Sequence, residues 1–165
     1  MKKFLPILLA MSVFCVSCAA LAAAEQEAEK EGAELAQNAI ATGDIKIEVH
    51  DIFSQYGPAI HSNGEYWLKI KDGKVTSSLP FFGTATYVTY GSSEGGIKFD
   101  NCPVQVSVLK SRLSKGEHKW AFVGKNDREE VEVIITFFES GSASIHCNSR
   151  TRSPMNYNGR LEPIE

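Results

Sequence analysis

The sequence has few of the features that would indicate a membrane channel, a metal enzyme or a nucleic-acid-binding protein. It has no apolar run of about 20 residues, the length that a membrane-spanning helix requires, and only four cysteines and four histidines among 165 residues. Lysine and arginine number 17 against 20 aspartates and glutamates, a formal net charge of −3. Because no basic surplus exists to neutralise phosphates, nucleic acid is not an expected partner. What is present is the composition of a globular protein, with 43% hydrophobic residues.

The first 24 residues have the pattern of a bacterial secretory signal. Residues 1–3 form a positively charged start, and residues 4–16 are an uninterrupted apolar stretch. Two cleavage positions fit this pattern. Cleavage after Ala24 (signal peptide 1–24) would release a soluble protein, whereas cleavage after residue 17 (signal 1–17) would leave Cys18 as a lipidated first residue. We therefore expect an exported protein, either periplasmic or anchored to the outer membrane by lipid.

Removing the leader changes what the cysteines and the charges indicate. The C-x-x-C spelled by Cys15 and Cys18 lies within the leader, so it does not predict redox or zinc chemistry. Cys102 and Cys147 remain, and an oxidising compartment permits a disulfide between them. Their strands are not neighbours in a simple meander, so we favour two buried free thiols. The charge becomes 15 − 20 = −5, which further disfavours a polyanionic partner.

The rest of the chain divides into a helical lead-in and a β domain. Residues 25–43 are rich in alanine and glutamate and predict a helix with little apolar area, which we interpret as a solvated tether or a helix lying loosely on the domain rather than a partner-binding helix. In residues 44–165, apolar residues recur at every second position, as in half-buried strands. The clearest runs are 45–49, 66–70, 104–108, 131–137 and 143–147. Asp72-Gly73 is the strongest hairpin signal. The pattern predicts an all-β antiparallel meander of about nine or ten short strands, closed as a lipocalin-like barrel or sandwich.

Several short blocks resemble a known bacterial family. Residues 79–85 read LPFFGTA, residues 90–91 read YG, and residues 95–99 read GGIKF. A later hairpin at 138–144 reads FESGSAS, and residues 156–159 read NYNG. In this order and spacing, the blocks resemble the family catalogued as domain of unknown function 4251, over roughly residues 44–162. The resemblance implies an exported envelope protein, and it implies no activity.

Aromatic residues supply the candidate binding positions. Phe81 and Phe82 either line the mouth of a ligand cavity or plug one end of a barrel, and we favour the plug because aromatic side chains are more often buried. Trp67 is out of phase with the inward residues of its strand, which makes it the best candidate for a functional exposed aromatic. The candidate ligand-binding residues are Phe81, Phe82, Tyr87, Tyr90 and Trp67.

No group of residues predicts catalysis, a bound metal or a cofactor. Residues 91–95 spell the G-x-S-x-G of hydrolases, but the helix that this motif requires does not follow. No two histidines have metal-ligand spacing. We expect a non-catalytic binding module that encloses or docks a small apolar or amphipathic ligand. The alternative is an accessory partner in an envelope protein complex, and contact with the membrane is expected only through the lipid anchor.

Overall fold

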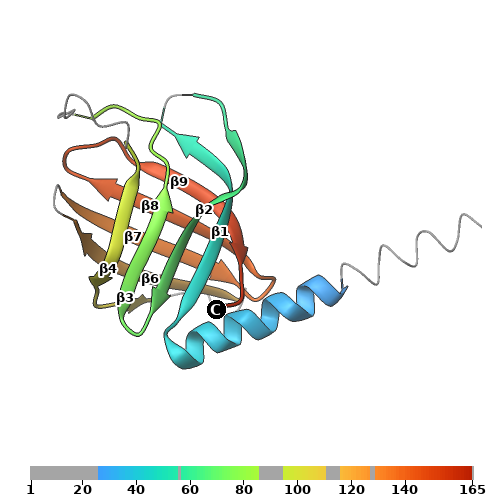
Figure 1. The fold of residues 1–165 in the computed structure, drawn as a ribbon. Helices are drawn as coiled ribbons and strands as arrows, with labels where there is room; N and C mark the ends of the chain where they lie inside the picture. Colours follow the sequence, from blue (N-terminus) through green and yellow to red (C-terminus); the bar gives the residue numbers. More distant parts are fainter. Residues whose placement is uncertain (1–25, 56, 86–94, 111–115, 127–128, 165) are drawn as a thin grey trace, which may run out of the picture.

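The computed structural model describes residues 26–55, 57–85, 95–110, 116–126 and 129–164 (Figure 1). Within these ranges, a helix over residues 26–42 precedes nine strands that form one antiparallel sheet. The strands are β1 (Ile45–Ser54), β2 (Ile60–Lys71), β3 (Lys74–Leu79), β4 (Ile97–Pro103), β5 (Ser107–Leu109), β6 (Glu117–Lys125), β7 (Glu130–Phe138), β8 (Ser142–Ser149) and β9 (Met155–Leu161). The predicted signal peptide, Cys18, Tyr87 and Tyr90 lie outside the described residues.

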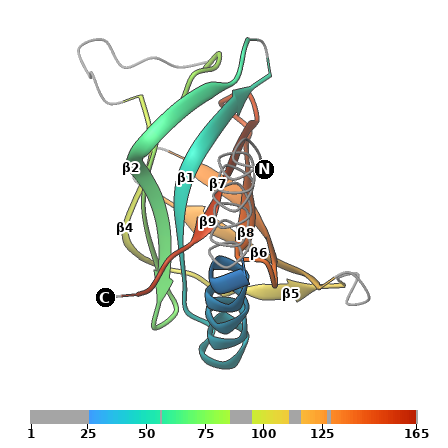
Figure 2. The same ribbon diagram turned by 90° about the vertical axis from the view of Figure 1, so that its right-hand side faces the viewer.

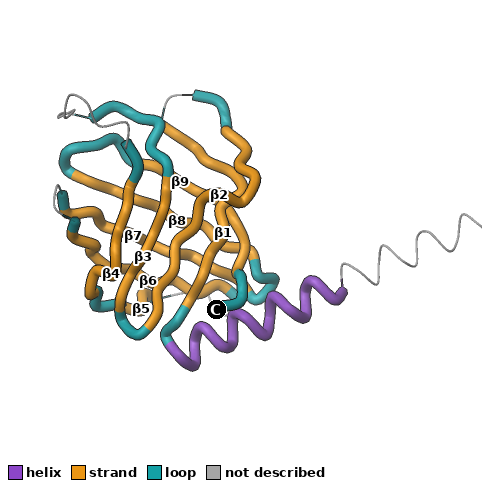
Figure 3. The backbone as a smooth tube through the Cα atoms, viewed as in Figure 1, coloured by secondary structure: helices purple, strands orange, loops and turns teal. Residues whose placement is uncertain are grey.

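The sheet is a meander that curls around its own core. Its strand order is β4-β3-β2-β1-β9-β8-β7-β6-β5, so consecutive strands pair throughout except β4 and β5, and β1 pairs with β9. The strands β1–β4 lie across β6–β9, and turning the molecule shows the two layers edge-on (Figures 1 and 2). Turns and loops gather at the ends of the strands (Figure 3). The prediction of an antiparallel meander of barrel type is confirmed, and the two edge strands are β4 and β5.

The core consists of the alternate residues that the sequence pattern predicts. Ile45, Ile47, Leu68 and Ile70 on β1 and β2 are at most 2% exposed. Large aromatic side chains face them from the other strands: Phe99, Trp120, Phe122, Phe137 and Tyr157. The rings of Trp120 and Phe137 pack edge to face with centroids 5.1 Å apart, a favourable geometry for two aromatic rings. The space between the two layers is thus occupied largely by aromatic residues.

The sequence predicts one hairpin turn correctly and one strand wrongly. Asp72 and Gly73 have φ angles of 52° and 68° and join β2 to β3, as a tight hairpin requires. The predicted strand 104–108 is wrong, because β4 ends at Pro103 and β5 begins at Ser107. These two strands lie at opposite edges of the sheet, so the intervening residues cross between edges instead of continuing one strand. Val108 is consequently 76% exposed.

The N-terminal helix packs on the sheet through small residues. Ala36 and Ala39 are 0% and 3% exposed, and Gly32 lies against the turn between β7 and β8. A Cβ atom on Gly32 would lie 2.6 Å from the carbonyl carbon of Ser140 and 2.7 Å from the nitrogen of Gly141. These residues offer little apolar area, and their small size allows the helix backbone to approach the sheet closely.

We expect Gly32→Ala to destabilise the protein, although alanine is the better helix former by about 1 kcal/mol. The added methyl group meets backbone atoms, which cannot rotate away, so the free energy of unfolding should fall by about 1–3 kcal/mol. Urea unfolding followed by circular dichroism measures this change. Gln37→Ala, at an exposed position of the same helix, is the matched control, and equal stabilisation by both substitutions would contradict the close packing.

Candidate functional site

Two places in the described part of the molecule combine predicted aromatic residues with polar side chains. The first, which we call the loop end, is formed by residues 79–85 and 95–96 together with Asn126, Glu129 and the β8–β9 connection. The second, which we call the Trp67 groove, lies on the outer face of the sheet and is lined by Lys46, Glu48, Gly64, Trp67 and Lys69. The loop end contains Phe81 and Phe82, so the structure separates the candidate residues between two surfaces.

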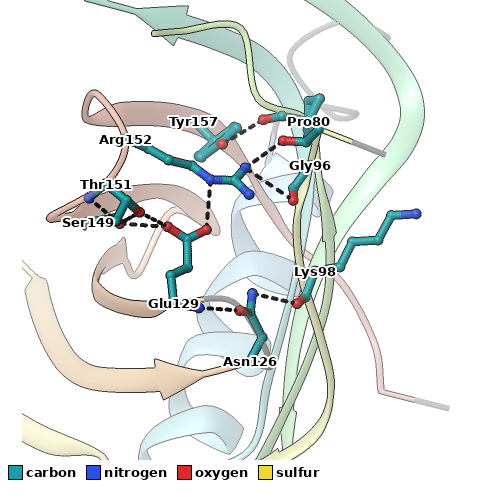
Figure 4. A network of polar contacts seen from close by, with 10 residues as sticks. Pro80, Gly96, Lys98, Asn126, Glu129, Ser149, Thr151, Arg152 and Tyr157 are labelled. Carbon is teal, nitrogen blue, oxygen red and sulfur yellow. Dashed lines mark hydrogen bonds and ion pairs between the residues drawn. The ribbon is translucent and has the colours of Figure 1, made fainter. Parts of the chain in front are cut away.

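A buried ion pair lies at the centre of the loop end (Figure 4). Arg152 Nε is 2.8 Å from Glu129 Oε1, and the two side chains are 13% and 4% exposed. The other carboxylate oxygen of Glu129 accepts hydrogen bonds from Ser149 Oγ at 2.6 Å and from Thr151 Oγ1 at 2.7 Å. Both oxygens of this buried carboxylate therefore contact cationic or hydroxyl groups, which offset the cost of removing its charge from water.

Arg152 also contacts two other segments, residues 79–83, which we call the LPFFG segment, and the glycine pair at residues 95–96. Its Nη1 atom donates a hydrogen bond to the carbonyl oxygen of Gly95 at 2.6 Å, and its guanidinium lies 5.0 Å from the centre of the Phe81 ring, within cation–π range. Tyr157 Oη donates to the carbonyl oxygen of Pro80 at 2.7 Å (Figure 4). Sequence blocks that are far apart in the chain thus meet at one end of the barrel.

These contacts give the LPFFG segment an architectural role. Leu79 is 1% exposed, Pro80 is buried and Phe81 is half-buried beneath Arg152. Together they cover this end of the core, which supports the interpretation of the segment as a plug. Phe82 differs, because its side chain is 44% exposed and remains available at the loop end.

The two cysteines of the β domain are unbridged and lie in different environments. Cys147 is buried on β8, whereas Cys102 is half-buried on the edge strand β4, where its Sγ donates a hydrogen bond to the carbonyl oxygen of Lys125 at 3.0 Å. Burial, with a smaller contribution from the negative charge of Glu129, raises the pKa of the Cys147 thiol to about 12. A thiol with so high a pKa is not a nucleophile at neutral pH.

The Trp67 groove has a volume of about 240 Å³. Across the β1–β2 ladder, Lys46 is directly opposite Lys69, and Glu48 is directly opposite Trp67, so these four side chains share the outer face. Lys69 Nζ lies 6.0 Å from the centre of the Trp67 ring. The groove therefore combines an aromatic surface, two ammonium groups and one carboxylate on two neighbouring strands.

A bulge in β2 forms one wall of the groove. Residues 62–65 of β2 lie between the pairs Val49–Tyr66 and Asp51–His61, opposite a single residue of β1. Within the bulge, Gly64 has a φ of 83°, and a Cβ atom on it would lie 2.5 Å from Glu48 Oε1. The phase of Trp67 predicts its outward position, but sequence reasoning missed the bulge. The turn dipeptide Asn63-Gly64 within a strand pattern is the signal that could have found it.

Comparison with known proteins identifies the family. The family model described as a domain of unknown function, DUF4251, matches residues 26–161. The chain belongs to the DUF4251 family. A crystal structure of a DUF4251 family protein from Bacteroides eggerthii DSM 20697 is similar to this structure, with a TM-score of 0.60 and 15% sequence identity over 84% of this chain and 91% of that chain. This likeness shows a shared fold. No curated protein matches the chain.

Among the described residues of this DUF4251 protein, no three histidine, cysteine, aspartate or glutamate side chains come close enough together to hold a metal ion. In the same residues, no helix has the length and apolar character needed to cross a membrane.

We expect Arg152→Met to lower the free energy of unfolding by about 3–5 kcal/mol, because it leaves the buried Glu129 carboxylate without its cation. The double variant Arg152→Met/Glu129→Gln removes both charges, and it should recover part of that loss while the Ser149 and Thr151 hydroxyls keep an acceptor. Unfolding in urea measures the free energy of unfolding of both variants, and because urea adds no salt, it does not screen the ion pair. A double variant less stable than the single variant would contradict the role assigned to this ion pair.

We also expect stability to fall above pH 9 through Cys147. Its pKa is 9.0 when unperturbed and about 12 in the folded protein, so the folded state retains a proton that the unfolded state loses. The stabilising contribution is complete below pH 9 and is lost as the pH rises toward 12, at up to about 1.4 kcal/mol per pH unit. Urea unfolding between about pH 8 and pH 10.5 should show a shallower decline for Cys147→Ala. Parallel declines for the two proteins would contradict the assignment.

Proposed function

We propose that this protein is an exported, non-catalytic binding module of the bacterial cell envelope whose ligand docks in the Trp67 groove. The groove is the observation that carries the proposal. It places a half-buried aromatic ring between charged side chains on two rigid, neighbouring strands. An aromatic surface bordered by a few convergent polar groups is the usual construction of a small-molecule site. Export is supported by the signal pattern of residues 1–24.

The composition of the core favours the outer face over the barrel interior as the site. An enclosed apolar ligand would need space between the two layers of the sheet. Phe99, Phe122 and Phe137 project into that space and are at most 3% exposed. The LPFFG segment covers the loop end above them. These side chains take up the volume that a lipocalin-like ligand would require, so we place the ligand outside the barrel.

The openness of the groove favours recognition over catalysis. Lys46, Glu48 and Lys69 line a surface that solvent reaches, whereas enzymes strengthen their electrostatic interactions by excluding water from the site. These groups can donate and accept hydrogen bonds and pair with charges. They are therefore suited to holding a ligand in place.

A second candidate function, an accessory partner in an envelope protein complex, is favoured by one observation at β5. This edge strand exposes 76% of Val108 and 39% of Leu109, and an edge strand can pair with a strand of another protein. β5 has only three residues, however, and short edge strands are one way in which proteins avoid such pairing. The groove is the better supported surface.

Hydroxyl-radical footprinting of the full-length protein distinguishes these surfaces. The protein is oxidised with and without a soluble cell-envelope extract of the producing bacterium, and modification of each residue is measured by mass spectrometry. We expect protection of Trp67 and no change at Phe82, which is 44% exposed at the loop end. Trp120, which is 5% exposed, is the unreactive control. Protection of Phe82 or Val108 with Trp67 unchanged would place binding at the loop end or at the β5 edge, and no protection would oppose the proposal.

A further inference from the structure

The charged side chains of the molecule are segregated. The helix over residues 26–42 carries four glutamates and one lysine. By contrast, the outward positions of β1, β2 and β9 beside Trp67 carry three basic side chains. Arg160 on β9 is paired in register with Glu48, and Lys46 with Lys69. A chain with a net charge of −3 thus presents three cationic side chains beside its half-buried tryptophan, with the carboxylate of Glu48 among them.

We propose that the Trp67 groove binds an acidic sugar, a saccharide ring that carries a carboxylate. This inference rests on the proposed function and specifies its ligand. The groove presents three kinds of surface within one volume of about 240 Å³: an aromatic ring, two ammonium groups and a carboxylate. The ligand must therefore combine an apolar face, a negative charge and hydrogen-bond donors.

Each part of an acidic sugar has a counterpart in the groove. The C–H face of a pyranose ring stacks on Trp67, which offers a broad apolar surface. The carboxylate of the sugar pairs with Lys46 and Lys69, which lie directly opposite each other on β1 and β2. The hydroxyl groups donate hydrogen bonds to Glu48, whose side chain also lines the groove.

Glu48 decides between an acidic sugar and a phosphate-rich surface such as an anionic membrane. A phosphate cannot donate to this carboxylate when it is fully ionised, and the two charges repel each other. Glu48 is also confined, because Gly64 in the β2 bulge passes so close that a Cβ atom there would be 2.5 Å from Glu48 Oε1. A carboxylate held inside a basic groove is useful to a ligand with hydroxyl groups and unfavourable to a phosphate.

The size of the groove suits one sugar ring, either as a monosaccharide or as one unit of an oligosaccharide. Its volume of about 240 Å³ is just below the range of about 300–1,000 Å³ typical of pockets that enclose a drug-sized ligand. Gly64 of the bulge lines one side of this hollow, whereas a flat membrane surface would be met best by a convex or planar face. The groove accommodates one ring while neighbouring units of an oligosaccharide extend over the basic outer face.

Isothermal titration calorimetry of the full-length protein tests this ligand class. The probes are short oligomers of galacturonate, mannuronate and glucuronate, and the methyl ester of each, which keeps the ring and hydroxyls but removes the charge. We expect at least one acid to bind, its ester to bind about tenfold more weakly or worse, and the affinity to fall as NaCl is added. Vesicles of phosphatidylmethanol, whose anionic phosphodiester headgroup carries no hydrogen-bond donor, are the membrane probe, and they should not bind.

Matched variants locate the binding. Trp67→Ala should abolish binding of the acid, and Lys46→Gln/Lys69→Gln should weaken it by about tenfold. Lys119→Gln/Lys125→Gln, which removes two lysines from the outer face of β6, is the control and should bind normally. Thermal unfolding of each variant establishes that it is folded.

The outcomes separate this inference from the proposed function. Equal binding of acid and ester, lost in Trp67→Ala, would overturn the acidic class and leave the groove as the binding site. Binding of vesicles without binding of any sugar would overturn the inference in favour of a lipid surface. Absence of sugar binding together with footprint protection of Trp67 would overturn the ligand class alone. If there is neither sugar binding nor footprint protection of Trp67, or if the acid still binds Trp67→Ala, the groove is not the binding site.

Discussion

A sheet that curls without closing leaves two edge strands that are not joined by backbone hydrogen bonds. The structure therefore depends on side-chain contacts across the gap where the curled sheet fails to close. Along this gap β4 lies against β6, and the ladder does not join them. Asn126 Nδ2 donates to the carbonyl oxygen of Lys98 at 3.3 Å. The Phe99 ring packs so closely over Gly124 that a Cβ atom there would lie 2.5 Å from it. Because closure rests on side chains and not on a repeating backbone pattern, it depends on these particular residues.

The two ends of the barrel are held by different close contacts, and the outer face takes part in neither. At the loop end, Arg152 joins the Glu129 carboxylate to the LPFFG segment. At the other end, Gly141 has a φ of 79°, and a Cβ atom on it would lie 2.8 Å from the Cα atom of Gly32, so the helix and the β7–β8 turn are in contact. Residues 79–85 and the β7–β8 turn therefore help to shape the two ends of the barrel, and the strand surface around Trp67 belongs to neither end.

Local patterns predicted the parts of the molecule that local physics determines. Alternation was enough to place Ile47 and Leu68 in the core, since burial of one strand face has a period of two, and Asp72-Gly73 was enough for a hairpin. The ion pair of Glu129 and Arg152 was not predictable, because nothing near either residue in the sequence indicates that they meet. The phase of Trp67 predicted an outward aromatic, but the groove required the bulge in β2, which disrupts the period. Phe82 and Trp67 were grouped by residue type, and the fold places them on different surfaces.

Charge also has a part that composition predicts, the net charge, and a part that only the fold determines, the placement of charged side chains. A net charge is a property of the whole chain and governs long-range attraction and repulsion. At physiological ionic strength, charges are screened over about 8 Å, so a charged group placed at the groove would interact mainly with the side chains beside it. The glutamates of the helix lower the net charge, while the antiparallel register of β2, β1 and β9 brings basic residues together around Trp67. The composition is acidic, yet the β1–β2 ladder sets Lys46 opposite Lys69 and Glu48 opposite Trp67. Ladder register, which composition does not report, therefore determines which ligand chemistry the exposed face favours.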